Sequence, residues 1–421
     1  MTSELHYDEA YVWIWLPGNI EPVVAGRIGR LRDGRLLFNY GRSYLARSDA
    51  ISIYEPELPL QPGELRPRAN MQLPSCIRDA SPDAWGRRVI MNRTVGPKGR
   101  EADTVDLDEL TYLLASGSDR TGALDFQSSA TEYVARERNN ATLDELIRSA
   151  ERVEQGMPLS PDLDLALQHG TSLGGARPKA LIEDSDRKHI AKFSASGDLY
   201  NVVKAEFVAM KLAREVGLNT ATVALTMALG KDVLLIERFD RTRGADGWTR
   251  RAMVSALTIL ELDETEARYA SYEDLATAIR HRFTDPRRTL EELFGRVVFN
   301  VLSGNTDDHA RNHAAFWDGK MLSLSPAYDI CPQSRAGGEA TQAMLITGNR
   351  RLSQLTVCLE AAPQFLLNAD RARAIIDAQL ATIRARWSAV CDEAGLAEVD
   401  RRFLRGRQFL NPFALEGWAE S

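Results

Sequence analysis

The residues best suited to chemistry lie in one short stretch, 305–312, and in the segment Tyr328-Asp329-Ile330 that follows it. Asp307 is followed five positions later by Asn312, and Asp329 comes after both. Such a set can transfer a phosphoryl group. One carboxylate accepts the proton of a substrate hydroxyl, while an amide and a second carboxylate hold magnesium on a bound nucleotide. The D-x4-N spacing is common, and a surface turn is the alternative for an isolated match.

Residues upstream supply further groups in the order that protein kinases use. Lys192 lies in a short apolar segment, 189–193, that is predicted to be a strand. Glu206 lies in the predicted helix 202–216 and is the candidate partner that orients this lysine. A strand lysine often only faces solvent, and surface helices carry many glutamates. The order lysine, glutamate, D-x4-N, aspartate therefore carries more weight than any single residue.

Two further segments fit nucleotide binding. Gly174 and Gly175 would let backbone amides approach phosphate oxygens, because no Cβ stands in the way. The segment matches neither G-x-x-x-x-G-K-[ST] nor G-x-G-x-x-G, so a plain tight turn is the alternative. Residues 237–239 end an apolar strand, where a hinge between lobes would offer backbone groups to adenine. An ordinary strand end is equally compatible with that segment.

A metal-dependent hydrolase is a competing interpretation of the same stretch. His309 and His313 are four residues apart and would share a face if they lay on one helix. Together with Asp307 and Asp308 they could bind a metal ion. This hypothesis explains neither the glycine pair nor Lys192.

The composition is that of an ordinary globular protein, with 44% hydrophobic and 26% charged residues among 421. This length allows two or three domains. A formal net charge of −7 argues against a surface that binds nucleic acid throughout. The four cysteines are far apart in sequence, which predicts neither a zinc site nor a disulfide framework. Neither a signal peptide nor a membrane-spanning run is expected, which favours a cytoplasmic protein.

The elements that must position these groups change in kind along the chain. Strands are predicted at 11–16, 23–28, 36–40 and 51–54, and helices at 86–92, 106–115 and 142–154. Ser81 is expected to cap the first of these helices, with Pro82 at the first helical position. A polar stretch at 156–161 is the candidate linker.

After the linker, strands are predicted at 180–183, 189–193, 221–229 and 233–239, with the helix 202–216 ending at Gly217. From residue 271 onward the pattern is mainly helical, including 290–302 and 372–391. We therefore predict an α+β, two-lobed protein-kinase-like fold with a strand-rich N-terminal part and a mainly helical C-terminal lobe. The expected parts are an N-terminal domain, a nucleotide-binding part and a helical lobe with the catalytic loop, at 1–155, 156–240 and 241–421.

Five separated motifs resemble those of the HipA family and occur in the same order. They are SLGGARPK at 172–179, AKF at 191–193, IERFDR at 236–241, NTDDHARN at 305–312 and PAYD at 326–329. Residues 112–117 and 119–124 also resemble, more loosely, the N-terminal coupling domain of that family. Its members are serine/threonine protein kinases that serve as toxins of type II toxin–antitoxin modules. The resemblance covers nearly the whole chain.

The resemblance implies a role for each matching residue. Asp307 would be the catalytic base, Asn312 and Asp329 would hold Mg²⁺, and Ser172 matches the serine that family members phosphorylate on themselves to switch off. The expected ATP contacts are Gly174, Gly175, Ala176, Arg177, Pro178, Lys179, Lys192, Glu237, Arg238, Phe239, His309 and Asn312. Asp329-Ile330-Cys331 stands where common kinases carry D-F-G, so no phenylalanine-driven switch is expected.

The predicted function is that of an ATP- and Mg²⁺-dependent serine/threonine kinase toxin. The resemblance implies that it inhibits translation by phosphorylating a translation-related protein, for example an aminoacyl-tRNA synthetase. It also implies a small DNA-binding antitoxin, HipB-like, as the partner through which DNA is contacted only indirectly. The alternative from another class is a binding module, a corepressor that acts with such an antitoxin and depends little on catalysis.

Overall fold

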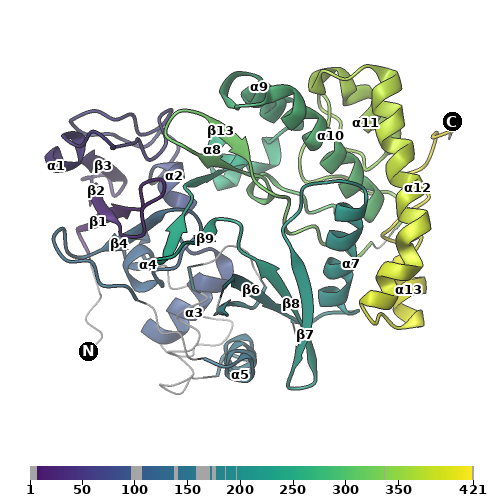
Figure 1. Ribbon diagram of the computed structural model, residues 1–421, viewed down its shortest axis with the longest axis horizontal. Coiled ribbons are helices and arrows are strands. Elements are labelled where there is room, and N and C mark those ends of the chain that lie inside the picture. The colour runs from purple at the N-terminus through teal and green to yellow at the C-terminus, as the bar shows by residue number, and fades with distance from the viewer. Residues whose placement is uncertain are drawn as a thin grey trace. The chain divides into compact units, whose positions relative to one another are not determined.

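Two compact units make up the protein, shown as a computed structural model in Figure 1. The structure describes residues 7–95, 107–136, 141–157, 171–172, 177–184, 186–195, 197–335 and 337–419. Unit 1 comprises Met1–Gly197, Thr226–Val254 and Trp317–Lys320, and unit 2 comprises Asp198–Leu225, Ser255–Phe316 and Met321–Ser421. No helix among the described residues is long and apolar enough to cross a membrane.

The N-terminal sheet of unit 1 is antiparallel, with the strand order β3-β2-β1-β4. Its strands are β1 Glu9–Ile14, β2 Val23–Arg30, β3 Leu36–Tyr40 and β4 Leu124–Gln127. A glycine is required at position 26, because a Cβ there would lie 2.1 Å from the Asn39 carbonyl oxygen of the neighbouring strand. Helices α1 Arg42–Leu45 and α4 Glu109–Ala115 contact this sheet. The other helices of the N-terminal part are α2 Ser75–Arg78 and α3 Ala84–Val95.

The second sheet of unit 1 has the order β5-β6-β8-β7 and holds the predicted nucleotide-binding strands. They are β5 Lys179–Glu183, β6 Lys188–Phe193, β7 Val223–Ala228 and β8 Lys231–Glu237. Helix α5 Leu143–Glu154 begins with a capping box formed by Thr142 and Glu145. Its apolar side chains recur at helical spacing, so they form one face that can be buried.

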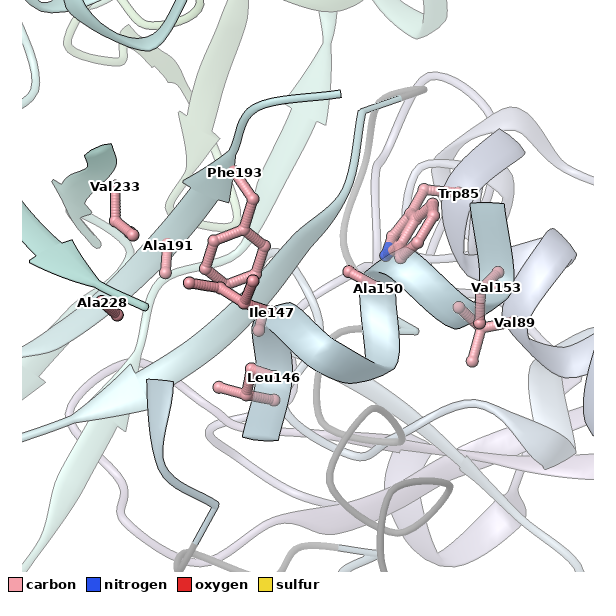
Figure 2. Packing of buried hydrophobic residues seen from close by; sticks show 11 residues of the cluster. Trp85, Val89, Leu146, Ile147, Ala150, Val153, Ala191, Phe193, Ala228 and Val233 are labelled. Atoms are coloured by element: carbon pink, nitrogen blue, oxygen red, sulfur yellow. The ribbon is translucent and has the colours of Figure 1, made fainter. Parts of the chain in front are cut away.

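Helices α3 and α5 share a hydrophobic core with this sheet (Figure 2). The buried side chains are Trp85 and Val89 of α3; Leu146, Ile147, Ala150 and Val153 of α5; and Ala180, Ala191, Phe193, Ala228 and Val233 of the strands. The indole Nε1 of Trp85 also donates a hydrogen bond to the Lys179 carbonyl oxygen, at 3.2 Å. Residues on both sides of the expected boundary at 155 thus belong to one core, and that boundary stays a prediction.

Unit 2 is mainly helical and packs around α10, an 18-residue helix spanning Pro286–Ser303. Asp285 caps its start, with Pro286 in the first turn, and Gly304 ends it in a left-handed conformation. Helices α9, α11 and α12 contact α10, and α7 packs against α12. The helices of this unit are α7 Val202–Glu215, α8 Ala256–Ile259, α9 Tyr272–Arg282, α11 Leu355–Ala361, α12 Ala369–Glu393 and α13 Glu398–Leu404.

Short elements complete the fold. A two-stranded sheet pairs β9 Arg241–Arg243 with β10 Trp248–Arg250, and a further sheet has the order β11-β12-β13. Its strands are Met253–Ser255, Ala314–Trp317 and Leu322–Leu324. The 3₁₀ helices are η2 Glu264–Tyr269, η3 Ala310–Asn312 and η4 Ala362–Phe365.

Most predicted elements match the structure to within a few residues, but the strand at 51–54 and the start of the helix at 86–92 differ. Residues 51–54 form no strand, because only Tyr54 makes an isolated bridge, to Leu58. Helix α3 begins at Ala84, so Ser81 and Pro82 precede it instead of starting it. Strand β4 was not predicted, because its alternation of apolar and polar residues lasts for only four positions, the shortest run that indicates a strand. The short strands β9 to β13 were not predicted either. The candidate linker at 156–161 lies mostly outside the described residues.

Candidate active site

The end of helix α10 delivers the predicted catalytic loop. Gly304 has φ +69°, and a Cβ at this position would lie 2.7 Å from the carbonyl oxygen of Gln408. The amide of Leu410 donates to the carbonyl oxygen of Leu302 at 2.8 Å, so the segment around Gln408 supports the helix end. Only glycine combines this backbone conformation with so close an approach. The chain can therefore turn sharply into the loop that carries Asp307.

Asp307 is exposed, and its backbone is held within the loop. Its carbonyl oxygen accepts hydrogen bonds from the His309 amide at 2.8 Å and from Asn312 Nδ2 at 3.3 Å. Loss of hydration raises the pKa of its carboxyl group, the His309 ring lowers it, and the charges of Asp329 and Asp308 raise it further. The influence of Asp329 shows that the two predicted site carboxylates lie near each other.

Asp329 adopts an unusual backbone conformation, with φ +59°. A residue with a side chain rarely occupies this left-handed region, which costs about 1–3 kcal/mol and is found most often at functional sites. The preceding residue is anchored, because the Tyr328 hydroxyl donates to the Arg311 carbonyl oxygen at 2.7 Å. Unit 2 by itself thus gathers Asp307, Asn312 and Asp329.

The gathered groups fit a magnesium ion bound to phosphates. Asn312 donates from Nδ2, which leaves its carbonyl oxygen on the opposite side of the amide. This oxygen and the Asp329 carboxylate are hard oxygen donors of the kind Mg²⁺ binds, usually in ones and twos with substrate phosphates completing the shell. A nearby cation would also offset the charge of Asp329 that raises the pKa of Asp307.

Asp308 faces the interior, in contrast to its neighbour. It is 3% exposed. Its Oδ2 atom accepts hydrogen bonds from Asn300 Nδ2 at 2.6 Å, from His313 Nε2 at 2.9 Å and from the Tyr272 hydroxyl. Burial opposes ionisation, but His313 and these hydrogen bonds outweigh it and lower the pKa of Asp308. The Asp-Asp pair is visible in the sequence, but this cluster is not, because Tyr272 lies 36 residues upstream and nothing in the sequence shows that Asn300 turns towards Asp308.

The geometry does not support the hydrolase hypothesis. His309 and His313 flank the single turn of η3, so they do not share a face of one helix. His313 turns inward to Asp308. Within the described ranges, no group of three or more His, Cys, Asp or Glu side chains is arranged to bind a metal ion.

Two predicted ATP-binding lysines face each other in unit 1. Strands β5 and β6 are antiparallel, and Lys179 pairs directly with Lys192 in their register. Directly opposed residues of an antiparallel pair project from the same face of the sheet. Lys179 is 5% and Lys192 is 8% exposed. Two buried positive charges at one place form a site suited to an anion such as a phosphate.

The segment before β5 is held by the N-terminal part of the chain. The Ser172 hydroxyl is buried and donates to the Asp119 carbonyl oxygen at 3.2 Å, while the hydroxyl of Thr171 accepts from the Gly117 amide at 3.1 Å. Gly174, Gly175 and Ala176 of the predicted phosphate loop lie outside the described residues. After them, the Pro178 carbonyl oxygen accepts from the Phe193 amide at 3.1 Å, which joins Arg177 and Pro178 to the sheet.

The predicted hinge adjoins a buried network of ion pairs. Asp119 Oδ1 lies 2.9 Å from Arg238 Nη1 and 2.8 Å from Arg241 Nη2, and its Oδ2 lies 2.8 Å from Lys188 Nζ. Asp240 Oδ2 pairs with the same two arginines, at 2.8 and 2.9 Å. Although burial opposes the charged form, the basic groups hold the pKa of Asp119 well below its usual range. Sequence analysis did not single out Asp119 as part of the site, although it lies in the coupling-domain resemblance.

Three predicted roles stay predictions. Arg238 donates its amide to the Lys188 carbonyl oxygen at 2.8 Å and its guanidinium to the ion network, so the structure gives this residue a structural part beside the expected hinge. Glu237 ends β8, and its carboxylate accepts from Arg187 at 3.3 Å. Glu206 is buried on α7 in unit 2, whereas Lys192 belongs to unit 1. The hinge at 237–239 and the pairing of Glu206 with Lys192 therefore stay predictions.

Comparison with curated proteins gives two informative relatives. The Y4mE protein of Sinorhizobium fredii is 30% identical over 130 residues, which cover 30% of this chain and 31% of that protein. The serine/threonine-protein kinase toxin HipA of Shewanella oneidensis is 25% identical over 158 residues, which cover 34% of this chain and 36% of the toxin. The chain thus matches about a third of the length of each of these two relatives.

Comparison with solved structures shows the fold. A complex of the toxin HipA from Shewanella oneidensis with HipB and operator DNA contains a chain that matches with a TM-score of 0.71. The match covers 97% of each chain at 17% sequence identity. The predicted α+β, two-lobed protein-kinase-like fold is confirmed.

Two family matches divide the sequence between them. Residues 16–127 match the family described as HipA N-terminal domain. Residues 171–387 match the family described as HipA-like C-terminal domain. The second match alone spans 217 of the 421 residues and contains Ser172, both lysines and the whole loop cluster of unit 2. Since the larger match exceeds half of the sequence and the smaller one precedes it in the expected order, the chain belongs to the HipA family.

Proposed function

We propose that this chain is an ATP- and Mg²⁺-dependent serine/threonine protein kinase that acts as the toxin of a toxin–antitoxin module. The observation that carries the proposal is the convergence of Asp307, Asn312 and Asp329 in unit 2. The opposed lysines of β5 and β6 support it, because they suit phosphate groups. The name of the Shewanella oneidensis relative supports the toxin role.

Each residue has a distinct part in the transfer. The Asp307 carboxylate accepts the proton as a serine or threonine hydroxyl oxygen bonds to the γ-phosphorus and the bond from that phosphorus to the β–γ bridging oxygen breaks, which releases ADP. The oxygens of Asn312 and Asp329 would hold Mg²⁺, which when bound offsets negative charge on the phosphates. Lys192 and Lys179 would bind phosphate oxygens. Catalysis is then mostly positioning and charge stabilisation.

The Asp307→Asn variant tests the central role. It keeps the shape of the side chain and removes the proton acceptor, so transfer of the γ-phosphate should fall by about 10²–10⁴-fold. The matched control is Asp370→Asn, the same change at an exposed position of unit 2, which should keep wild-type activity. Measurement of phosphate incorporated from γ-labelled ATP into protein gives the answer. Wild-type transfer by Asp307→Asn would rule out this site.

We propose further that Ser172 is the residue by which the kinase switches itself off. A phosphate there adds about −1.5 to −2 charges. The Ser172 side chain is buried and bonded to the Asp119 carbonyl oxygen, and such a group cannot stay in place without a large desolvation cost. The segment should leave its position, and the adjoining phosphate loop should no longer bind nucleotide.

Nucleotide titration of phosphorylated and unphosphorylated protein tests this switch. The phosphorylated form should bind ATP at least about tenfold more weakly, given the added charge. Ser172→Ala, which cannot be modified, should keep the affinity of the unphosphorylated protein after incubation with ATP. Equal affinity of the two wild-type forms would exclude the switch.

A small HipB-like DNA-binding antitoxin is the proposed partner, because the structurally similar HipA was solved with HipB and operator DNA. The net charge of −7 suits a partner that itself supplies the basic contacts to DNA. In this arrangement the chain also serves as a corepressor. Asp307→Asn should keep operator repression with the antitoxin and lose toxicity. Toxicity that survives this substitution would favour the purely binding role.

The proposed substrate is a translation-related protein such as an aminoacyl-tRNA synthetase, as the family resemblance implies. Phosphoproteomics after induced expression, with the Asp307→Asn protein as the reference, should show new phosphoserine or phosphothreonine on such a protein. New sites restricted to unrelated proteins would reject this substrate class.

A further inference from the structure

The buried carboxylate of Asp308 joins three elements of unit 2. Tyr272 is the first residue of α9, Asn300 lies in the last turns of α10, and His313 follows η3. Each of the three donates to the Oδ2 atom of Asp308. All three donors are 3% exposed or less. The ring of Tyr272 also packs edge-on against the His313 imidazole, with centroids 5.6 Å apart and planes at 84°.

These contacts hold the loop between Asn305 and His313 in place as well as the Asp308 carboxylate. An ionised carboxylate away from water is costly unless several donors satisfy it, so Asp308 has one favourable place in this cluster. Asn300 reaches the loop a second time, because its Oδ1 accepts from Asn305 Nδ2 at 3.0 Å. On the other side, the His313 carbonyl oxygen accepts from the Ala256 amide at 2.7 Å. The loop between Asn305 and His313 is therefore anchored before, within and after its aspartate pair.

The anchoring of Asp308 also determines the direction of the Asp307 side chain. Asp307 and Asp308 are consecutive, and the first is exposed while the second is buried. Because adjacent side chains in this turn leave the backbone in different directions, holding Asp308 inward directs Asp307 outward. The Asp307 carbonyl oxygen, which accepts from the His309 amide and Asn312 Nδ2, is fixed by the same backbone.

We propose that Asp308 is the positioning residue of the phosphoryl-transfer site, and that Tyr272, Asn300 and His313 clamp it so that the Asp307 carboxylate meets the substrate hydroxyl. Asp308 itself touches neither substrate nor nucleotide. The inference rests on the proposed kinase function and deepens it. It states that three residues outside the D-x4-N motif fix the position of the loop that carries Asp307.

The Tyr272→Phe variant is the sharpest test, because it removes one hydroxyl and keeps the ring that packs on His313. Loss of one hydrogen bond to a charged group should lower kcat about tenfold and leave the KM for ATP within about twofold. The control is Tyr269→Phe, the same change at an exposed residue nearby, which should keep wild-type values.

A second pair of variants separates donation from packing at His313. His313→Leu fills similar space without a donor and should lower kcat about 100-fold, because the loop loses its geometry. His313→Gln places a side-chain N–H near the position of the ring Nε2, so it should recover most of that loss. Equal kcat in the leucine and glutamine variants would contradict a role for the hydrogen bond.

Hydrogen exchange provides a readout that does not depend on activity. In Tyr272→Phe, amides of residues 305–313 should exchange faster, while those in the middle of α10 should keep their protection. Unchanged exchange in the loop, or wild-type kcat, would overturn the inference. Faster exchange throughout α10 would also overturn it, since the cluster would then only hold the fold. If the wild-type protein transfers no phosphate, the kinase proposal fails, and the exchange experiment still decides the positioning role.

Discussion

Lys179 and Lys192 come from separate motifs and lie opposite each other on adjacent strands. Like charges that face each other across an antiparallel pair destabilise a sheet by about 0.2–1 kcal/mol. Their register makes this arrangement unavoidable while β5 and β6 pair as they do. A bound anion such as a triphosphate would offset this repulsion, which is consistent with the proposed role of both lysines.

The lysine pair gives a prediction at the scale of single residues. Lys192→Met and Lys179→Met should each raise the KM for ATP more than about tenfold, because a charge-assisted contact to phosphate is lost. Lys320→Met, an exposed lysine of unit 1, is the control. An unchanged KM in both site variants would remove the lysines from the nucleotide site.

Residue types and spacing predicted which residues belong to the candidate site, but not which side chains are buried or which backbone conformations they adopt. The order of Lys192, Asp307, Asn312 and Asp329 was visible in the sequence, because chemistry fixes the kinds of residue required. The sequence could not show that Asp308 is buried, since its three donors come from separate elements. The left-handed backbone of Asp329 was equally hidden, because aspartate enters this region more often than most residues but still seldom does so.

At the scale of elements, the end of β8 is joined to the segment before β4 by buried charges. Arg238 and Arg241 lie between Asp119 and Asp240. The amide of Gly122 also donates to Asp240 Oδ2, at 2.8 Å. Removal of one partner from such a network leaves an unpaired buried charge, which usually costs several kcal/mol. The predicted hinge is therefore held in place by residues from the N-terminal part.

Acid should weaken this junction. Burial opposes ionisation of Asp240, yet Arg238 and Arg241 outweigh it and lower its pKa to about 2. The pKa of an unfolded aspartate is about 3.9. A depressed folded pKa contributes stability above the unfolded value, and this stability is lost as the pH falls from about 4 towards 2. The urea midpoint of unfolding should therefore drop steeply over that range.

The Asp240→Asn variant is the comparison for this pH dependence. It should be less stable than wild type at pH 7, because the arginines lose a partner, and its midpoint should fall less between about pH 4 and pH 2. An identical pH profile in the two proteins would show that Asp240 does not contribute to acid unfolding.

Elements with regular patterns were predictable, and those defined by tertiary contacts were not. Helices α5 and α10 have caps and apolar periodicity within their own sequences. Strand β4 depends on pairing with β1, more than a hundred residues away, and its four residues are too short a run to predict a strand by themselves. Residues 51–54 are apolar enough for a strand, but their neighbours offer no complete pairing partner.

At the scale of the whole molecule, each unit is assembled from three stretches of the chain. Unit 1 contains the N-terminal residues and returns at Thr226–Val254 and Trp317–Lys320. No single cut separates the units, and the predicted division at 155 and 240 stays a prediction. The shared core of α3, α5 and the second sheet shows why, since helices and strands from distant segments bury one another.

This assembly predicts the behaviour of a fragment. Residues 1–155 expressed alone should aggregate or unfold without cooperativity, because the apolar faces of α3 and α5 lose the strands that cover them. Circular dichroism and thermal melting of the fragment, with the full chain as the reference, provide the measurement. A soluble fragment with a sharp melting transition would contradict this prediction and favour a separate N-terminal domain.

The contact between Gly304 and the backbone of Gln408 bears on the timing of synthesis. A ribosome makes the turn that presents Asp307 about a hundred residues before it makes the segment that fills the space beside that turn. A nascent chain halted between these points would carry every motif of the site without its support. The candidate site would then reach its final geometry only late in translation, once the segment around residue 408 has been made.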